Sequence, residues 1–114
     1  MRLRKCLLLL PTAYNDGTEI PPTVVAGILD DLYEVFGGHT VDGTCDGVYK
    51  MADGHKARDK CLKVWVAVEP NRLDELKKTA QRIAGVLRQE KLWFEVTYAD
   101  VELLDPSQGT GEES

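Results

Sequence analysis

Histidine exchanges a proton near neutral pH, so His39 and His55 are the first residues to consider for acid–base chemistry. His39 follows the pair Gly37-Gly38 and begins a predicted strand, and functional side chains gather at such junctions between loops and strands. His55 follows the turn dipeptide Asp53-Gly54, where a solvated side chain is expected. We therefore take His39 as the candidate for proton transfer or ligand contact.

Two tyrosines extend this candidate set. Tyr14 begins the polar segment 14–19, which is a turn by composition and could contact a ligand through Tyr14 and Asp16. Tyr49 lies in the glycine-rich strand that follows His39. A site made of His39, Tyr14 and Tyr49 would suit a small enzyme, but the sequence contains no nucleophile–base pair and no cofactor fingerprint. The sequence predicts no cofactor and does not decide whether the chain is an enzyme.

The cysteines point away from metal and redox chemistry. Cys6, Cys45 and Cys61 are odd in number and widely spaced, which argues against a zinc knuckle, a redox dithiol or a disulfide framework. The acidic spacing in residues 40–47 is similar to a calcium loop, but no glutamate follows at the required position. The sequence predicts no metal site, thiols buried as small apolar groups, and a reducing cytoplasm.

Charge and hydropathy exclude two classes of partner. The net charge is −5, of which residues 105–114 carry −3, so the rest of the chain is nearly neutral and lacks the positive surface of a nucleic-acid-binding protein. No segment approaches the roughly 20 apolar residues of a membrane span. The leucines after Lys5 stop at Pro11, which favours a strand buried on both faces over a secretion signal.

The elements that must position these residues follow a simple order. A first strand leads to a helix that begins at Pro21-Pro22 and ends at Gly37-Gly38, and two strands then meet at a turn. Asn71 is the predicted N-cap of a second helix, and residues 92–98 form the last strand. The order β-α-β-β-α-β predicts an α+β, ferredoxin-like two-layer sandwich. Its antiparallel sheet would have strand order 4-1-3-2 with both helices on one face. Residues 1–104 would form this single domain, and residues 105–114 a disordered acidic tail.

The face of the sheet without helices is the expected functional surface. A two-residue turn at Asp53-Gly54 would pair Asp42 with Trp65 on this face, beside Lys63, and the last strand would add Trp93. A bulge in the glycine-rich strand would change this register, and the sequence does not decide which leucines of the first strand face the same way.

Two uses of this face are compatible with each other. A second copy of the chain could cover the tryptophans in a homodimer, or Trp65 and Trp93 could line a small-molecule cavity with Lys63 and Asp42 as orienting groups. The leading prediction is therefore a homodimeric ligand-binding or protein-interaction module. The alternatives are a small enzyme of the dimeric α+β barrel kind and a subunit of a larger assembly.

Residues 36–70, FGGHTVDGTCDGVYKMADGHKARDKCLKVWVAVEP, resemble a group of small bacterial domains of unknown function. The likeness consists of a glycine-rich strand, an Asp-Gly turn and a hydrophobic strand ending near a proline, and RQEKLWFEV resembles the entry into that group's last strand. Tyr49 stands near the position of that group's tryptophan. The resemblance implies the β-α-β-β-α-β fold and implies no activity.

Overall fold

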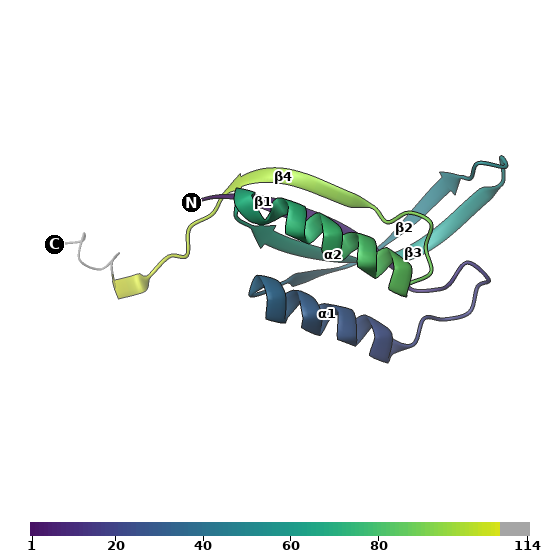
Figure 1. Ribbon diagram of the computed structural model, residues 1–114, viewed down its shortest axis with the longest axis horizontal. Helices are drawn as coiled ribbons and strands as arrows, with labels where there is room; N and C mark the ends of the chain where they lie inside the picture. Colours follow the sequence, from purple (N-terminus) through teal and green to yellow (C-terminus); the bar gives the residue numbers. More distant parts are fainter. Residues whose placement is uncertain (108–114) are drawn as a thin grey trace.

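The computed structural model describes residues 1–107 of the 114-residue chain. It confirms the predicted element order and the ferredoxin-like α+β sandwich, with both helices against one face of an antiparallel sheet (Figure 1). The strand order β2-β3-β1-β4 is the predicted 4-1-3-2. The elements are β1 (Arg2–Pro11), α1 (Pro22–Phe36), β2 (Thr40–Lys50), β3 (Lys56–Val68), the 3-10 helix η1 (Pro70–Arg72), α2 (Leu73–Val86) and β4 (Phe94–Asp100).

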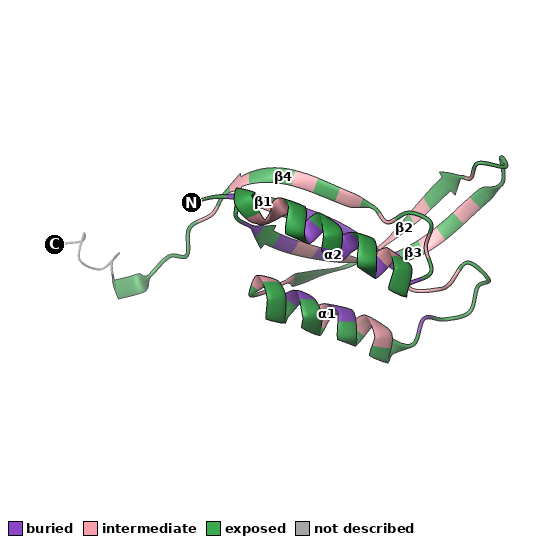
Figure 2. Cartoon of the chain, in the orientation of Figure 1, coloured by how far each residue is buried: buried purple, intermediate pink, exposed green. Residues whose placement is uncertain are grey.

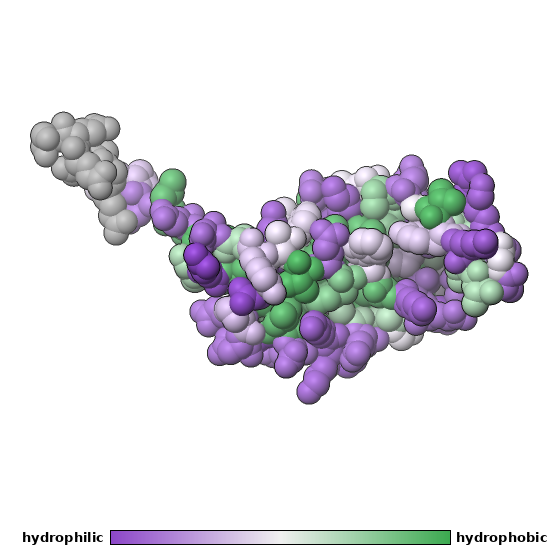
Figure 3. All heavy atoms as spheres, turned by 90° about the horizontal axis from the view of Figure 1, so that it is seen from above, coloured by the Kyte–Doolittle hydropathy of each residue, from purple (hydrophilic) through white to green (hydrophobic). Residues whose placement is uncertain are grey.

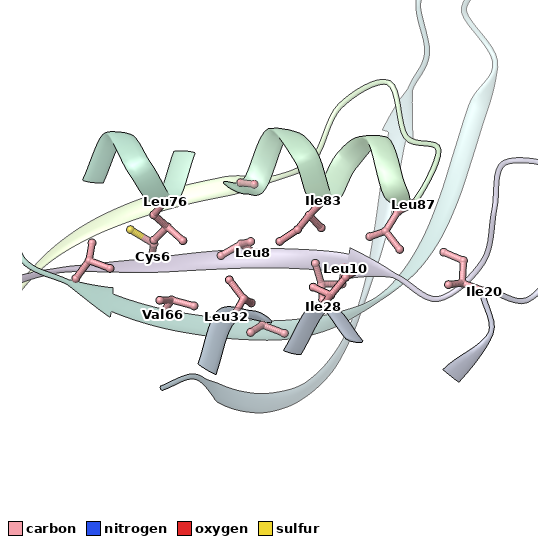
Figure 4. Packing of buried hydrophobic residues seen from close by; sticks show 13 residues of the cluster. Cys6, Leu8, Leu10, Ile20, Ile28, Leu32, Val66, Leu76, Ile83 and Leu87 are labelled. Carbon is pink, nitrogen blue, oxygen red and sulfur yellow. The ribbon is translucent and has the colours of Figure 1, made fainter. Parts of the chain in front are cut away.

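The central strand β1 divides its side chains between the two faces of the sheet. Cys6, Leu8 and Leu10 are buried beneath the helices (Figure 4), where Leu8 lies opposite Val64 of β3. Leu7 belongs to the alternate set, which faces away from the helices. Complete burial of each such leucine contributes about 1.5–3 kcal/mol, so β1 is the main hydrophobic element of the core.

The first helix has the predicted ends. Pro22 occupies its first turn, where a missing N–H costs nothing, and Ile28 and Leu32 form its buried face. Gly37 ends the helix with a left-handed φ of 85°, and its N–H donates to the Tyr33 carbonyl at 2.9 Å. The chain is thereby turned sharply at the position that leads into His39.

The predicted start of the second helix is wrong by one residue. Asn71 lies inside η1, and Arg72 is the N-cap residue of α2, without a side-chain capping bond. Pro70 fixes the first backbone angle of this short turn, which competes with capping by Asn71. The Arg72 guanidinium instead binds both Glu75 carboxylate oxygens at 3.0 Å and the Val35 carbonyl at 2.9 Å. It thus ties the start of α2 to the end of α1.

The hairpin between β2 and β3 has a longer turn than predicted. The Met51 N–H donates to the His55 carbonyl and the Gly54 N–H donates to the Met51 carbonyl, so three residues form the loop. Gly54 takes a φ of 90°, which is the left-handed position of a three-residue hairpin turn. The two-residue turn was therefore wrong, and the pairing near the turn is shifted by one residue, with Cys45 opposite Cys61.

A bulge then shifts the register a second time. Between the pairs Val41–Val64 and Thr44–Leu62, the two residues Asp42 and Gly43 stand opposite one residue of β3. Gly43 has a φ of 72°, a conformation that glycine adopts without strain. The bulge turns the Asp42 side chain to the face of the sheet without helices, which we call the open face. There its carboxylate lies beside Trp65, as predicted, although the backbone partner of Trp65 is Thr40.

Exposure increases toward the two ends of the molecule (Figure 2). The turn end of the β2–β3 hairpin extends past the helices and is largely exposed. At the other end the Val101 N–H donates to the Met1 carbonyl, and residues 102–107 leave the body of the domain. Residues 108–114, which include most of the predicted disordered tail, lie outside the described residues.

The bulge glycine provides a test of this register. We expect Gly43→Ala to lower the free energy of unfolding by about 1–2 kcal/mol, because an alanine at this positive φ is strained. Gly27→Ala is the matched control, since no atom lies within 4 Å of its added Cβ in α1, and it should stabilise by about 0.5–1 kcal/mol. Urea unfolding of both variants measures the difference, and equal effects would contradict the bulge.

Candidate functional site

A pocket of about 630 Å³ opens at the end of the sheet where β1 begins and β4 ends. Its walls come from three parts of the chain that meet only in the folded domain. They are Lys5, Trp65 and Ala67 of β1 and β3, residues 36–40 where α1 ends and β2 begins, and residues 99–101 at the end of β4. The pocket therefore combines an aromatic ring, an imidazole, an ammonium group and a carboxylate.

His39 carries the clearest sign of an incomplete site. Its Nδ1 atom is buried and has no hydrogen-bond partner among residues 1–107. A buried polar atom without a partner costs about 1–3 kcal/mol of folding free energy. Because His39 lines the pocket, its imidazole ring borders the space that a ligand would occupy, although Nδ1 itself is covered and the ring would have to turn before that atom could meet a ligand.

Trp65 is held by a polar network on its other side. Its indole N–H donates to Asp42 Oδ2 at 3.1 Å, and the Lys63 ammonium lies 3.4 Å from the same oxygen. The indole N–H, followed by the Lys63 ammonium, keeps the pKa of the Asp42 carboxyl below its usual range. The Lys5 ammonium lies 4.3 Å from the centroid of the Trp65 ring, a cation–π distance. The aromatic wall of the pocket is thus fixed at its edge and carries a cation over its face.

Charge at the pocket rim is divided. Asp100 forms an ion pair with Arg2, with 3.3 Å between Nε and Oδ1, and both side chains are largely exposed. Lys5 also lines the pocket, and within residues 1–107 no carboxylate lies at ion-pair distance from its ammonium group. The interior of the pocket therefore favours an anionic group near Lys5.

The structure brings together part of the predicted site. His39 and Trp65 line the pocket, and Asp42 and Lys63 act behind them by holding the Trp65 ring. Trp93 lies outside the pocket, is 51% exposed, and donates its indole N–H to Glu95 at 3.2 Å. The two tryptophans therefore do not form one aromatic cavity.

The two tyrosines are elsewhere in the domain. Tyr14 packs against the core, and the Arg88 guanidinium lies 4.7 Å from its ring centroid. Tyr49 covers Gly47 in the hairpin so closely that an added Cβ would lie 2.5 Å from its hydroxyl oxygen. Burial is the main cause that raises the pKa of Tyr49. Neither ring lines the pocket of His39, so the structure does not bring together the three residues that the enzyme alternative placed near one site.

Cys6 and Cys61 have little nucleophilic character, because burial raises the pKa of both thiols. Cys45 and Cys61 are cross-strand partners, and all three cysteines are free thiols. Burial first, and then nearby acidic groups, raise the pKa of Cys61 to about 11. Its thiolate is therefore scarce at neutral pH. Within residues 1–107, no group of three or more His, Cys, Asp and Glu side chains could hold a metal ion.

Sequence reasoning missed three contributors to the pocket. Lys5 is a cation at the start of a run of leucines, and this position was the only sign in the sequence that it could belong to a site. Gly37-Gly38 was recognised as a helix end but not as a wall that leaves space beside His39. Asp100 closes the far side because β4 extends two residues beyond the predicted end.

Comparison with known proteins supports the fold. No family model and no curated protein sequence matches this chain. Among solved structures, a phage SAM lyase in complex with S-methyl-5'-thioadenosine superposes with a TM-score of 0.60 at 10% identity, covering 90% of this chain and 93% of that chain. The divalent cation tolerance protein CutA1 from Thermus thermophilus superposes with a TM-score of 0.54 at 13% identity, covering 96% and 93%. These likenesses show a shared ferredoxin-like fold. Within the described residues, the structure contains no helix long and apolar enough to cross a membrane.

The hydrogen bonds that hold Trp65 predict how the pKa of Asp42 depends on the indole N–H. Because the pKa of Asp42 is lowered, the stabilising interaction is present above the ordinary aspartate pKa and is lost as pH falls through the lowered value. Trp65→Phe keeps the ring but removes the N–H, so the Asp42 pKa should rise toward its ordinary value. Carboxyl NMR measures this change. The control Trp93→Phe removes an indole that binds Glu95 and should leave Asp42 unchanged; equal shifts would contradict the network.

Proposed function

We propose that this chain is a ligand-binding module that associates with a second copy of itself, with its ligand site in the pocket of His39. The observation that carries this proposal is the buried His39 Nδ1 atom without a partner in the described residues, in the lining of a 630 Å³ pocket. Pockets of about this size hold small organic ligands, with few polar groups that orient them. A ligand that hydrogen-bonds to Nδ1 would remove the cost of burying it.

The ligand class follows from the groups that line the pocket. Trp65 offers an apolar ring in the pocket wall, and the Lys5 ammonium lies over the face of that ring. A small planar organic anion satisfies both groups, with its ring against Trp65 and its carboxylate near Lys5. The other polar end of such a ligand would reach His39.

Binding is favoured over catalysis by the positions of the candidate residues. His39 has neither Tyr14 nor Tyr49 beside it in the pocket, and Cys61 is poorly ionised. The phage lyase shares the fold and was solved with a small nucleoside derivative, which is consistent with a ligand site in this architecture. The choice of a planar anion rests on the residues of this chain alone.

Self-association would use the open face. On this face Trp93 is 51% exposed, while Leu7 is only 8% exposed between its cross-strand partners Trp65 and Glu95. The apolar area is thus smaller than the leucine strip predicted from the sequence, and Trp93 is its main exposed aromatic. A two-fold pairing of open faces would cover this ring. We assign the protein to the cytoplasm, on the basis of its three free thiols.

Benzoate and its neutral isostere benzamide test the ligand class. We expect benzoate to shift the amide signals of residues 37–40 and the His39 ring in a saturable NMR titration, with benzamide binding at least about tenfold more weakly. Lys5→Gln should weaken benzoate binding by about 10–100-fold, which corresponds to loss of a charge-assisted hydrogen bond. The same variant should bind benzamide unchanged. Equal binding of the two probes, or shifts confined to other parts of the domain, would contradict the proposal.

The unpaired His39 imidazole predicts that its removal will stabilise the free protein and abolish ligand binding. His39→Phe replaces the buried polar atom with an apolar ring, so the free energy of unfolding without ligand should rise by about 1–3 kcal/mol. Benzoate should stabilise the parent protein against urea but not this variant. His55→Phe is the control, because it removes only an exposed contact between the His55 ring and Asp53, so stability should change by less than about 0.5 kcal/mol and the response to benzoate should not change. A less stable His39→Phe variant that still responds to benzoate would refute the assignment.

A further inference from the structure

A second hollow lies between the later part of α2 and the start of β4. It has a volume of about 650 Å³, and its apolar lining includes Ala80, Ala84, Leu92 and Phe94. Small side chains on this face of α2 leave the space open, and Gly85 adds no Cβ to fill it. We call this hollow the α2–β4 groove. It is distinct from the pocket of His39, with which it shares no residue.

The α2–β4 groove has a mixed rim with an excess of positive charge. Lys77 and Lys91 line it together with one acid, Glu90. An apolar floor between lysines suits a short segment that carries hydrophobic side chains flanked by carboxylates.

The chain itself contains such a segment. Leu103 and Leu104 are 88% and 83% exposed, and they stand between Glu102 and Asp105. Hydrophobic side chains project into solvent on the extension that leads to the grey residues (Figure 3). Because the two leucines are adjacent, they form one apolar patch, and contact with a partner would remove that patch from water.

The segment cannot reach the Phe94 end of the groove of its own chain. Phe94 in the groove and Asp100 are the two ends of β4, so about 20 Å of extended strand separates them. Leu104 follows Asp100 by four residues, which span at most about 14 Å. The tail also leaves the molecule at the end opposite the C-terminus of α2 (Figure 1).

From these observations we propose that residues 102–105 of one copy dock into the α2–β4 groove of a second copy. Leu103 and Leu104 contact the apolar floor, and Glu102 and Asp105 lie near Lys77 and Lys91. Reciprocal docking of two tails gives a two-fold contact between copies, which would be a second interface beside the open-face pairing proposed above. This contact is independent of the ligand pocket and of the open face.

Mixed-label NMR with full-length chains tests the docking. The labelled partner is a ¹⁵N Leu103→Ser/Leu104→Ser chain, which keeps the groove but lacks a functional tail. Adding unlabelled parent chain should shift the amides of Gly85, Leu92 and Phe94 in a saturable manner. Adding unlabelled Leu103→Ser/Leu104→Ser chain should cause less than about a tenth of that shift at equal concentration, because loss of two buried leucines weakens binding more than tenfold.

A matched pair at one groove position provides the control. Gly85→Glu, introduced into the labelled chain, narrows the groove and repels the acidic tail, so the parent chain should no longer shift it. Gly85→Ala adds only a methyl group in open space and should retain the response. Three results would overturn the proposal: no shift of the groove amides, equal shifts with both unlabelled chains, or a shift that persists in the Gly85→Glu chain. Equal movement would mean that another surface of the second copy covers the groove.

Discussion

The pairing of β1 with β3 is the constraint on which the rest of the domain depends. Leu8 and Val64 lie opposite each other with no exposed surface, and both helices pack over this pair and its neighbours. A shift of one residue in this pairing would exchange the two faces of β1 and expose the core. The same alternation that buries Leu8 directs Lys5 to the other face, beside Trp65. The core and the pocket therefore share one register.

The hairpin shows how irregular backbone adjusts a site without disturbing the core. The glycine at the turn and the glycine at the bulge each change the register of β2 by one residue, and the second change brings Asp42 next to Trp65. Asp42 then binds both the indole and Lys63, which fixes the aromatic wall of the pocket. The part of the sheet with the least hydrophobic packing thus determines the orientation of a site residue.

The two ends of the sheet carry different kinds of surface. The end where β1 begins and β4 ends has a pocket of mixed polar and apolar lining with an unsatisfied imidazole, whereas the end of α2 has an apolar groove bordered by lysines. A small ligand suits the first surface, and a peptide segment suits the second. Both surfaces exist because small residues stand where larger ones would close the space: Gly37-Gly38 beside His39, and Ala84 with Gly85 on α2.

The sequence by itself determined the fold, because helix periodicity, strand alternation and turn residues are local signals that agreed with one another. It also identified His39, Trp65, Asp42 and Lys63 as site candidates by residue type and strand position. Tertiary structure alone decided which of these meet. Two single-residue shifts in β2 left no trace in the hydrophobic pattern, since that strand is largely exposed and its glycines fit either register. Likewise, Lys5, His39 and Asp100 are far apart in sequence, so only the packing of α1 and β4 around the sheet could join them in one pocket.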